Sequence, residues 1–230
     1  IEYSLDKINW YNWDGEEIKS YIIYMRGYGN TVITGAFYHE GWRFETKDKL
    51  ICRGNIEALL NYKLCANGEH PPMSDRCYRG MFKGCTSLVE APALPATELA
   101  DSCYIGMFSG CTSLSAPPAL PAEKLAEDCY AAMFKGCTSL KDTPVLPATE
   151  LADSCYYSMF EDCTSLVEAP ALPATELADS CYYSMFSGCT SLVEAPALPA
   201  TELAMLCYYG MFEGCISLKD RSNLPKSCFE

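Results

Sequence analysis

Apolar side chains return at the same spacing through most of the chain. The segment from Cys155 to Ser180 reads CYYSMFEDCTSLVEAPALPATELADS, and nearly the same string begins again at Cys181. Self-similarity at a period of about 20–50 residues is typical of folds that stack one structural unit, and leucine-rich repeats have periods of about 20–29 residues. Because each unit has only one apolar side, it can bury that side only against its neighbours.

Each repeat opens on a pattern that predicts a short helix. In the fourth repeat, apolar residues lie at i, i+1, i+4, i+5 and i+8, which form one stripe of a helix. These residues are Cys155, Tyr156, Met159, Phe160 and Cys163. Asp153 and Ser154 precede the stripe, and both residue types favour a helix N-cap. Five repeats have glycine just before the second cysteine, where a helix would end. The glycines are Gly84, Gly110, Gly136, Gly188 and Gly214, and the fourth repeat has Asp162 instead.

The middle of each repeat predicts a short and weak parallel strand. Leu166, Ala169 and Ala171 follow the L-x-x-L-x-L spacing of a leucine-rich-repeat strand. Pro170 lies inside this segment and removes one donor from the hydrogen-bond ladder. The string LPATEL then turns the chain back towards the next repeat.

These elements predict an α+β fold in two parts. Residues 65–230 are expected to form a right-handed leucine-rich-repeat solenoid of about six coils, each with a short helix and a weak strand. Residues 1–64 are expected to form a small β-rich N-terminal cap with a short helix near residues 55–60. The string SLDKINW in this cap predicts a β-hairpin, with Trp10 or Trp13 packed inward.

Twelve of the fifteen cysteines follow the repeat in two series that are offset by eight residues. The first series is Cys77, Cys103, Cys129, Cys155, Cys181 and Cys207. The second series is Cys85, Cys111, Cys137, Cys163, Cys189 and Cys215. Disulfides, a metal ladder and buried thiols are the three interpretations. Buried thiols are favoured, because both series lie on the apolar stripe and unpaired cysteine packs as a small hydrophobic residue. A zinc site would need closer pairs such as C-x-x-C.

The same stripe supplies the rest of the predicted structural core. Met81 and Phe82 recur in every repeat, as Met159 and Phe160 do in the fourth. Three cysteines lie outside the two series and are the better candidates for a disulfide or for chemical reactivity. They are Cys52, Cys65 and Cys228.

An acidic residue recurs at one position of the predicted strand. This acidic row consists of Glu90, Asp142, Glu168, Glu194 and Asp220, and Ala116 interrupts it. Carboxylates stacked at a strand spacing of about 5 Å can hold Ca²⁺ or meet a basic partner. The favoured interpretation is a solvated face that keeps an apolar repeat protein soluble. A second acidic row is assigned to the N-termini of the predicted helices. It consists of Asp101, Glu127, Asp153 and Asp179.

Tyrosine occupies one position beside the stripe in the last three repeats only. This tyrosine row is Tyr157, Tyr183 and Tyr209. The earlier repeats have Arg79, Ile105 and Ala131 at the same position. A partly exposed row of tyrosines can serve as a contact surface, since tyrosine supplies contact area at a low entropic cost. Packing between neighbouring coils explains the row equally well.

Composition and charge exclude several classes of function. Hydrophobic residues make up 49% of the chain and charged residues 20%, which is typical of a folded protein. The net charge of −13 argues against a nucleic-acid partner, because phosphate binding needs clustered Lys and Arg. The apolar runs are far shorter than the roughly 20 residues of a membrane helix. No cofactor or metal ion is expected. The chain is expected to be a monomer.

The chain contains no recognisable catalytic motif. His39 and His70 are the only histidines, and neither lies in a recognisable catalytic motif. The sequence has neither a glycine-rich phosphate loop nor an H-E-x-x-H motif. Carboxylate pairs recur with the repeat, whereas an active site normally interrupts a pattern. The chain is therefore not expected to be an enzyme.

The repeat resembles a known family over about two thirds of the chain, from Pro72 to Leu224. The string MFxGCTSLxxAPxLPATxLAxSCY is similar to the BspA-like leucine-rich repeats of bacterial surface proteins, in particular the LPAT type of Bacteroides-like gut bacteria. The opening string IEYSLDKINWYNW resembles the hairpin that often precedes such arrays, and LICRGNIEALLNYK resembles the segment that leads into their first repeat.

The resemblance implies a bacterial protein at the cell surface or outside the cell, with a signal segment that is not in this chain. It implies adhesion to a host or bacterial surface protein or glycan. The candidate binding residues are the tyrosine row and the acidic row. A rigid structural spacer and a phage fibre component are the alternatives. The near-identity of the repeats favours a spacer, and the tyrosine row favours binding.

Overall fold

The structure, a computed structural model, describes residues 1–34, 46 and 48–230 of the chain. His39 and part of the predicted cap lie outside these described residues. The fold is mixed and mostly non-helical, with two small sheets and one α-helix among the described residues. Three antiparallel strands, in the order β2-β1-β3, form the first sheet. They are β1 (Glu2–Ser4), β2 (Tyr11–Asn12) and β3 (Tyr24–Arg26).

A second sheet and the helix connect this N-terminal part to the repeats. β4 (Leu50–Ile51) pairs in parallel with β5 (Leu88–Glu90) of the first repeat. The helix α1 (Ala58–Ala66) overlaps the predicted helix near residues 55–60, and non-helical dihedral angles at Asn61 divide it. Its residues Leu59 and Leu60 are buried against the core.

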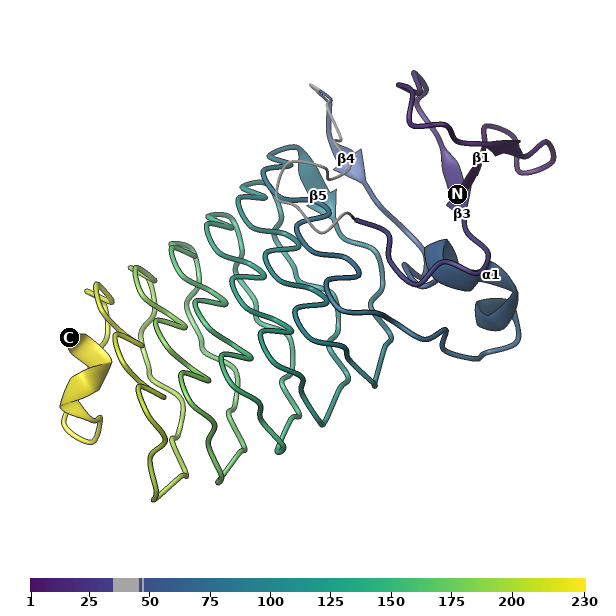
Figure 1. Ribbon diagram of the computed structural model, residues 1–230. Helices are drawn as coiled ribbons and strands as arrows, with labels where there is room; N and C mark the ends of the chain where they lie inside the picture. The colour runs from purple at the N-terminus through teal and green to yellow at the C-terminus, as the bar shows by residue number, and fades with distance from the viewer. Residues whose placement is uncertain (35–45, 47) are drawn as a thin grey trace.

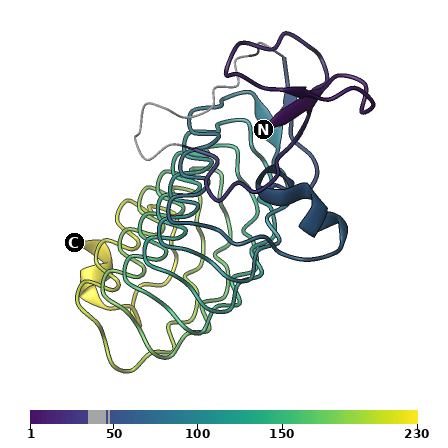
Figure 2. The same cartoon turned by 45° about the vertical axis from the view of Figure 1, so that its right-hand side comes forward.

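The repeats wind into coils that lie side by side in sequence order, from teal to yellow (Figure 1). The view in Figure 2 shows the same stacking, with α1 at the N-terminal end and the C-terminal 3₁₀ helix η1 at the other. η1 spans Lys226–Phe229. Each coil therefore contacts the coil before it and the coil after it.

The predicted helix in each repeat is wrong. The residues from 70 to 224 are all described and contain no α-helix. In the second coil, Ser102, Gly106 and Gly110 have φ angles of 57°, 60° and 75°, which lie in the left-handed region. A right-handed helix cannot contain a left-handed residue at every fourth position. The segment is instead a continuous run of turns.

Alternate backbone amides in this run have different partners. Ile105, Met107 and Ser109 each donate to the carbonyl three residues earlier, which closes a turn. Tyr104 and Phe108 donate instead to Cys129 and Met133 of the next coil, at 3.0 and 2.9 Å. Because buried amides need partners, the run satisfies half of its donors locally and the other half only through stacking.

The strand side of the coils is weak, as predicted. β5 is the one named strand within the repeats, and later coils show only isolated bridges such as Glu168 with Glu194. The prolines of the A-P-x-L-P string remove donors from this side, so a continuous ladder cannot form. Stacking therefore depends mainly on the turn run.

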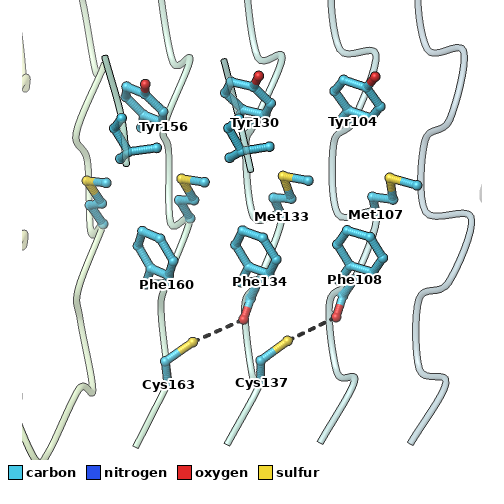
Figure 3. Close-up of a cluster of buried hydrophobic side chains, with 14 of the residues drawn as sticks. Tyr104, Met107, Phe108, Tyr130, Met133, Phe134, Cys137, Tyr156, Phe160 and Cys163 are labelled. Atoms are coloured by element: carbon cyan, nitrogen blue, oxygen red, sulfur yellow. Dashed lines mark hydrogen bonds between the residues drawn. The ribbon is translucent and has the colours of Figure 1, made fainter. Parts of the chain in front are cut away.

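Side chains from the turn run form the core in parallel rows (Figure 3). One buried row is Tyr78, Tyr104, Tyr130, Tyr156, Tyr182 and Tyr208, whose neighbouring ring centroids lie 5.5–5.9 Å apart. A row of phenylalanines, from Phe82 to Phe212, stacks at 5.5–5.7 Å. A stacked aromatic pair contributes about 0.5–1.5 kcal/mol beyond its buried area. Methionines such as Met107 and Met133 are buried between these rows.

At both ends of the stack, segments outside the repeat form backbone hydrogen bonds with the terminal coil. At the N-terminal end, the amides of Ile33 and Thr34 donate to the Cys77 carbonyl at 3.0 and 3.1 Å. At the C-terminal end, Phe212 donates to the carbonyl of Cys228 in η1 at 2.8 Å. The terminal coils thus find partners in segments outside the repeat.

Candidate binding site

The tyrosine row forms a stacked surface on the outside of the turn run. The rings of Tyr157 and Tyr183 are 4.8 Å apart with an interplanar angle of 8°. Those of Tyr183 and Tyr209 are 5.2 Å apart with an angle of 24°. Tyr157 is 38% exposed, and the other two are half-buried. The row therefore packs coil on coil, as one of the two interpretations expected, and it is also partly exposed to solvent. Its role as a contact surface stays a prediction.

Tyr157 stands at the end of this row. In the preceding coil its position is taken by Ala131, whose methyl group is buried. A methyl group covers much less area than a phenol ring, so the side of the Tyr157 ring that faces this coil has no ring stacked on it. The larger exposure of Tyr157 agrees with this difference.

An ion pair lies next to Tyr157. The Nζ atom of Lys135 lies 2.8 Å from Oε2 of Glu161, and the pair bridges the third and fourth coils. Partial burial raises the pKa of Tyr157, the charges of Tyr183 and Glu161 raise it further, and Lys135 opposes them. Sequence reasoning missed this pair, because neither residue belongs to a row of like charges.

The predicted acidic row is exposed along its whole length. At its N-terminal end Glu90 accepts two hydrogen bonds from Arg53, at 2.9 and 3.0 Å, and these bonds lower the pKa of Glu90. At the other end Asp220 accepts from the backbone amide and the hydroxyl of Ser222, which lowers its pKa. Asp142, Glu168 and Glu194 lie between them on the strand side, away from the turn run.

The second acidic row does not cap helices, which corrects the sequence-based assignment. Asp153 instead accepts a hydrogen bond from the backbone amide of Asp179, 26 residues later, at 3.1 Å. Asp179 in turn accepts from the amide of Met205 at 2.9 Å. These carboxylates therefore link neighbouring coils, and the last coil has Met205 at this position.

The segment between Lys141 and Lys219 carries negative charge only. Residues 142–218 contain eleven Asp and Glu residues and no Lys, Arg or His. Lys141 and Lys219 stand just outside this segment. The three tyrosines of the row all lie within it, so the exposed aromatic surface has an acidic surrounding.

The twelve repeat cysteines are buried thiols that form no disulfide. From the second coil on, those of the second series donate to the preceding coil, as Cys137 does to the Phe108 carbonyl at 3.1 Å (Figure 3). Burial raises the pKa of Cys137 from its ordinary value of 9.0 to about 12. Thiols so strongly protonated are poor nucleophiles and poor metal ligands. Among the described residues, no three His, Cys, Asp or Glu side chains are placed to share a metal ion.

One buried ionisable pair lies beside α1. His70 Nδ1 is 2.8 Å from Glu57 Oε2, and the Glu57 side chain is 1% exposed while that of His70 is half-exposed. The other carboxylate oxygen of Glu57 has no hydrogen-bond partner. Burial and then the charge of Glu57 raise the pKa of the nearby Cys65 thiol, so this group is not an activated nucleophile. No sequence motif signals the pair.

Comparisons with known proteins gave no match. No family model matches the chain. No curated protein and no solved structure resembles it to a significant degree. In the part of the chain that the structure describes, no helix has the length and apolar character needed to span a bilayer. The site must therefore be interpreted from its own geometry.

Proposed function

We propose that this chain is a non-catalytic binding module, displayed at a bacterial cell surface, whose stacked coils contact a protein or glycan partner. The observation that carries this proposal is the stacked and partly exposed row of Tyr157, Tyr183 and Tyr209. Tyrosine is enriched at binding surfaces because it offers a large, rigid contact area with few rotatable bonds. The row occurs only in the last three coils.

For the fold, we propose a right-handed solenoid of the BspA-like leucine-rich-repeat type over residues 65–230, with residues 1–64 as its cap. The repeat string and the weak strand side support this assignment. Backbone hydrogen bonds between coils hold the surface rigid, so binding costs little ordering of the module itself.

Substitution of the tyrosine row tests the proposal. The variant with Tyr157, Tyr183 and Tyr209 changed to Ala is compared with the wild-type chain on an array of glycans and extracellular matrix proteins. We expect affinity for the bound partner to fall by ~1 kcal/mol or more if the tyrosines are hot spots. The matched control changes an exposed row on another side of the coils. Its substitutions are Thr149→Ala, Thr175→Ala and Thr201→Ala.

A rigid spacer is the second candidate, and the continuous hydrogen bonding between nearly identical coils favours it. A second variant, with Glu168 and Glu194 changed to Gln, separates the two functions. This glutamate variant should lower the affinity only for a basic or Ca²⁺-dependent partner. If the tyrosine variant and this glutamate variant both retain full binding, the coils act as a spacer and the binding proposal fails.

A further inference from the structure

Three features of the tyrosine row restrict the chemistry of its partner. The row lies inside a segment with eleven acidic and no basic residues. One face of the Tyr157 ring has no stacked ring on it, because the preceding coil has Ala131 there. Glu161 lies close enough to Tyr157 to affect its pKa. An electron-rich ring face beside a carboxylate attracts a planar cation.

The described part of the chain contains an example of this arrangement. The guanidinium carbon of Arg26 lies 3.8 Å from the ring centroid of Trp10 and 4.5 Å from that of Tyr62. The same guanidinium pairs with Glu2 at 2.7 Å. Arginine thus stacks between two aromatic rings and binds a carboxylate at the same time.

We propose that the surface of Tyr157, Tyr183 and Tyr209 docks a basic polypeptide, and that an arginine of this partner stacks on the free face of Tyr157. This inference rests on the proposed binding function and names the class of partner. The partner's guanidinium pairs with Glu161 and replaces Lys135 in the existing ion pair.

Charge decides between a basic polypeptide and the other partners that stack on tyrosine. The field of the later coils repels an anionic partner and speeds the approach of a cationic one. A neutral sugar ring also stacks on tyrosine, but it gains nothing from the negative charge of the surrounding coils. Arginine is favoured over lysine because its planar group can stack and form two parallel hydrogen bonds.

Peptide binding to the full chain tests the inference. The probes are a fluorescently labelled peptide of alternating arginine and serine, the same peptide with lysine for arginine, and a neutral oligosaccharide. Fluorescence anisotropy is measured at low and at physiological salt. We expect the arginine peptide to bind most tightly, and its affinity to fall as salt screens the charges.

Three variants locate the site. Tyr157→Ala should weaken arginine-peptide binding by about fivefold or more, which corresponds to ~1 kcal/mol. Tyr157→Phe should retain binding, because the ring face remains. Lys135→Gln should strengthen binding, because it removes the competing cation. A gain of affinity cannot result from a folding defect. The control Tyr21→Ala removes a fully exposed tyrosine outside the coils.

Three outcomes would overturn the inference. In the first, Tyr157→Ala and the control Tyr21→Ala lose the same affinity for the arginine peptide. In the second, Lys135→Gln binds this peptide more weakly than the wild-type chain. In the third, the oligosaccharide binds more tightly than the arginine peptide. If one of these occurs while the triple tyrosine variant still loses binding on the array, only the class of partner is wrong. If the triple variant and the Glu168/Glu194 variant both bind normally, the proposed binding function fails with it.

Discussion

The thiol of Cys137 donates a hydrogen bond to the backbone carbonyl of Phe108, 29 residues earlier, at a sulfur–oxygen distance of 3.1 Å. The same carbonyl accepts the backbone amide of Cys111 at 3.0 Å. Equivalent thiol bonds occur in the second, fourth, fifth and sixth coils, for example from Cys163 to Phe134. The second cysteine series therefore links each coil to the preceding one, whereas the backbone amides of the turn run link each coil to the following one.

This thiol bond predicts a difference between the two cysteine series. Cys137→Ala removes side-chain volume and one hydrogen bond between coils. Cys129→Ala, in the first series and equally buried, removes the same volume without a thiol bond to the carbonyl of another coil. Because a buried hydrogen bond contributes about 0.5–1.5 kcal/mol, Cys137→Ala should cost more by about that amount. Urea unfolding of both variants measures the difference, and equal losses would show that the thiol acts only by filling space.

The buried thiols also predict that the folded state loses stability at alkaline pH. Burial raises the pKa of Cys77, Cys137 and Cys181 from 9.0 to about 12. Between these values the unfolded chain releases protons that the folded chain retains, so the free energy of unfolding falls as pH rises above about 9. Each such thiol removes about 1.4 kcal/mol per pH unit in this range.

Circular dichroism between pH 7 and 11 measures this alkaline transition, and a count of thiols identifies the ionising groups. Thiol reagent in denaturant without reductant should recover most of the fifteen cysteines, whereas the native protein at pH 8 should react mainly at the half-exposed Cys65. A recovery of three or fewer thiols in denaturant would contradict the buried-thiol account.

The sequence was sufficient to predict the repeat, its apolar stripe and the weakness of its strand. It was not sufficient to separate a helix from the run of turns. Apolar residues at i, i+1, i+4, i+5 and i+8 have a period of four, and over nine residues a helical period of 3.6 is nearly indistinguishable from it. Local patterns cannot reveal that alternate amides bind the next coil. The sequence held one hint, since Gly80, Gly106 and Gly210 recur at one position of the run, but the other three repeats have Ala132, Ser158 and Ser184 there.

The tyrosine row was visible in the sequence, but its free face was not. That face results from stacking Tyr157 on a coil that has Ala131, which is a relationship between residues 26 positions apart. The ion pair of Lys135 and Glu161 arises in the same way. Likewise, Asp153 lies where a helix N-cap is expected, and only the structure shows its bond to the next coil.

Glycine substitution distinguishes the run of turns from a helix by the sign of its effect. Ala132 has a φ angle of 51°, in the left-handed region that costs a non-glycine residue roughly 1–2 kcal/mol. Ala132→Gly should therefore stabilise the protein by up to about 1 kcal/mol, since glycine adopts this conformation freely. In a helix the same change would destabilise by about 1 kcal/mol. Thermal unfolding gives the sign, and Ala131→Gly, at a buried position without a positive φ angle, should destabilise.

Deletion of one whole repeat should be tolerated far better than deletion of half a repeat. Removing residues 155–180 joins Ser154 to Cys181 in unbroken register, so the Tyr130 amide can donate to the Cys181 carbonyl in place of that of Cys155. The chain loses one coil and one interface, and repeat stability is approximately a sum of such terms. This variant should fold with reduced stability.

The half-repeat deletion of residues 155–167 joins Ser154 to Glu168 and removes one complete turn run. It takes away Tyr156 and Phe160 and leaves a gap in both buried aromatic rows. The amides of the third coil then lose their partners in the fourth, and a buried donor without a partner costs about 1–3 kcal/mol. Urea unfolding and near-ultraviolet circular dichroism compare the two deletions. The half-repeat variant should lose cooperative unfolding, and equal behaviour of the two would be incompatible with coils held together by hydrogen bonds between successive turn runs.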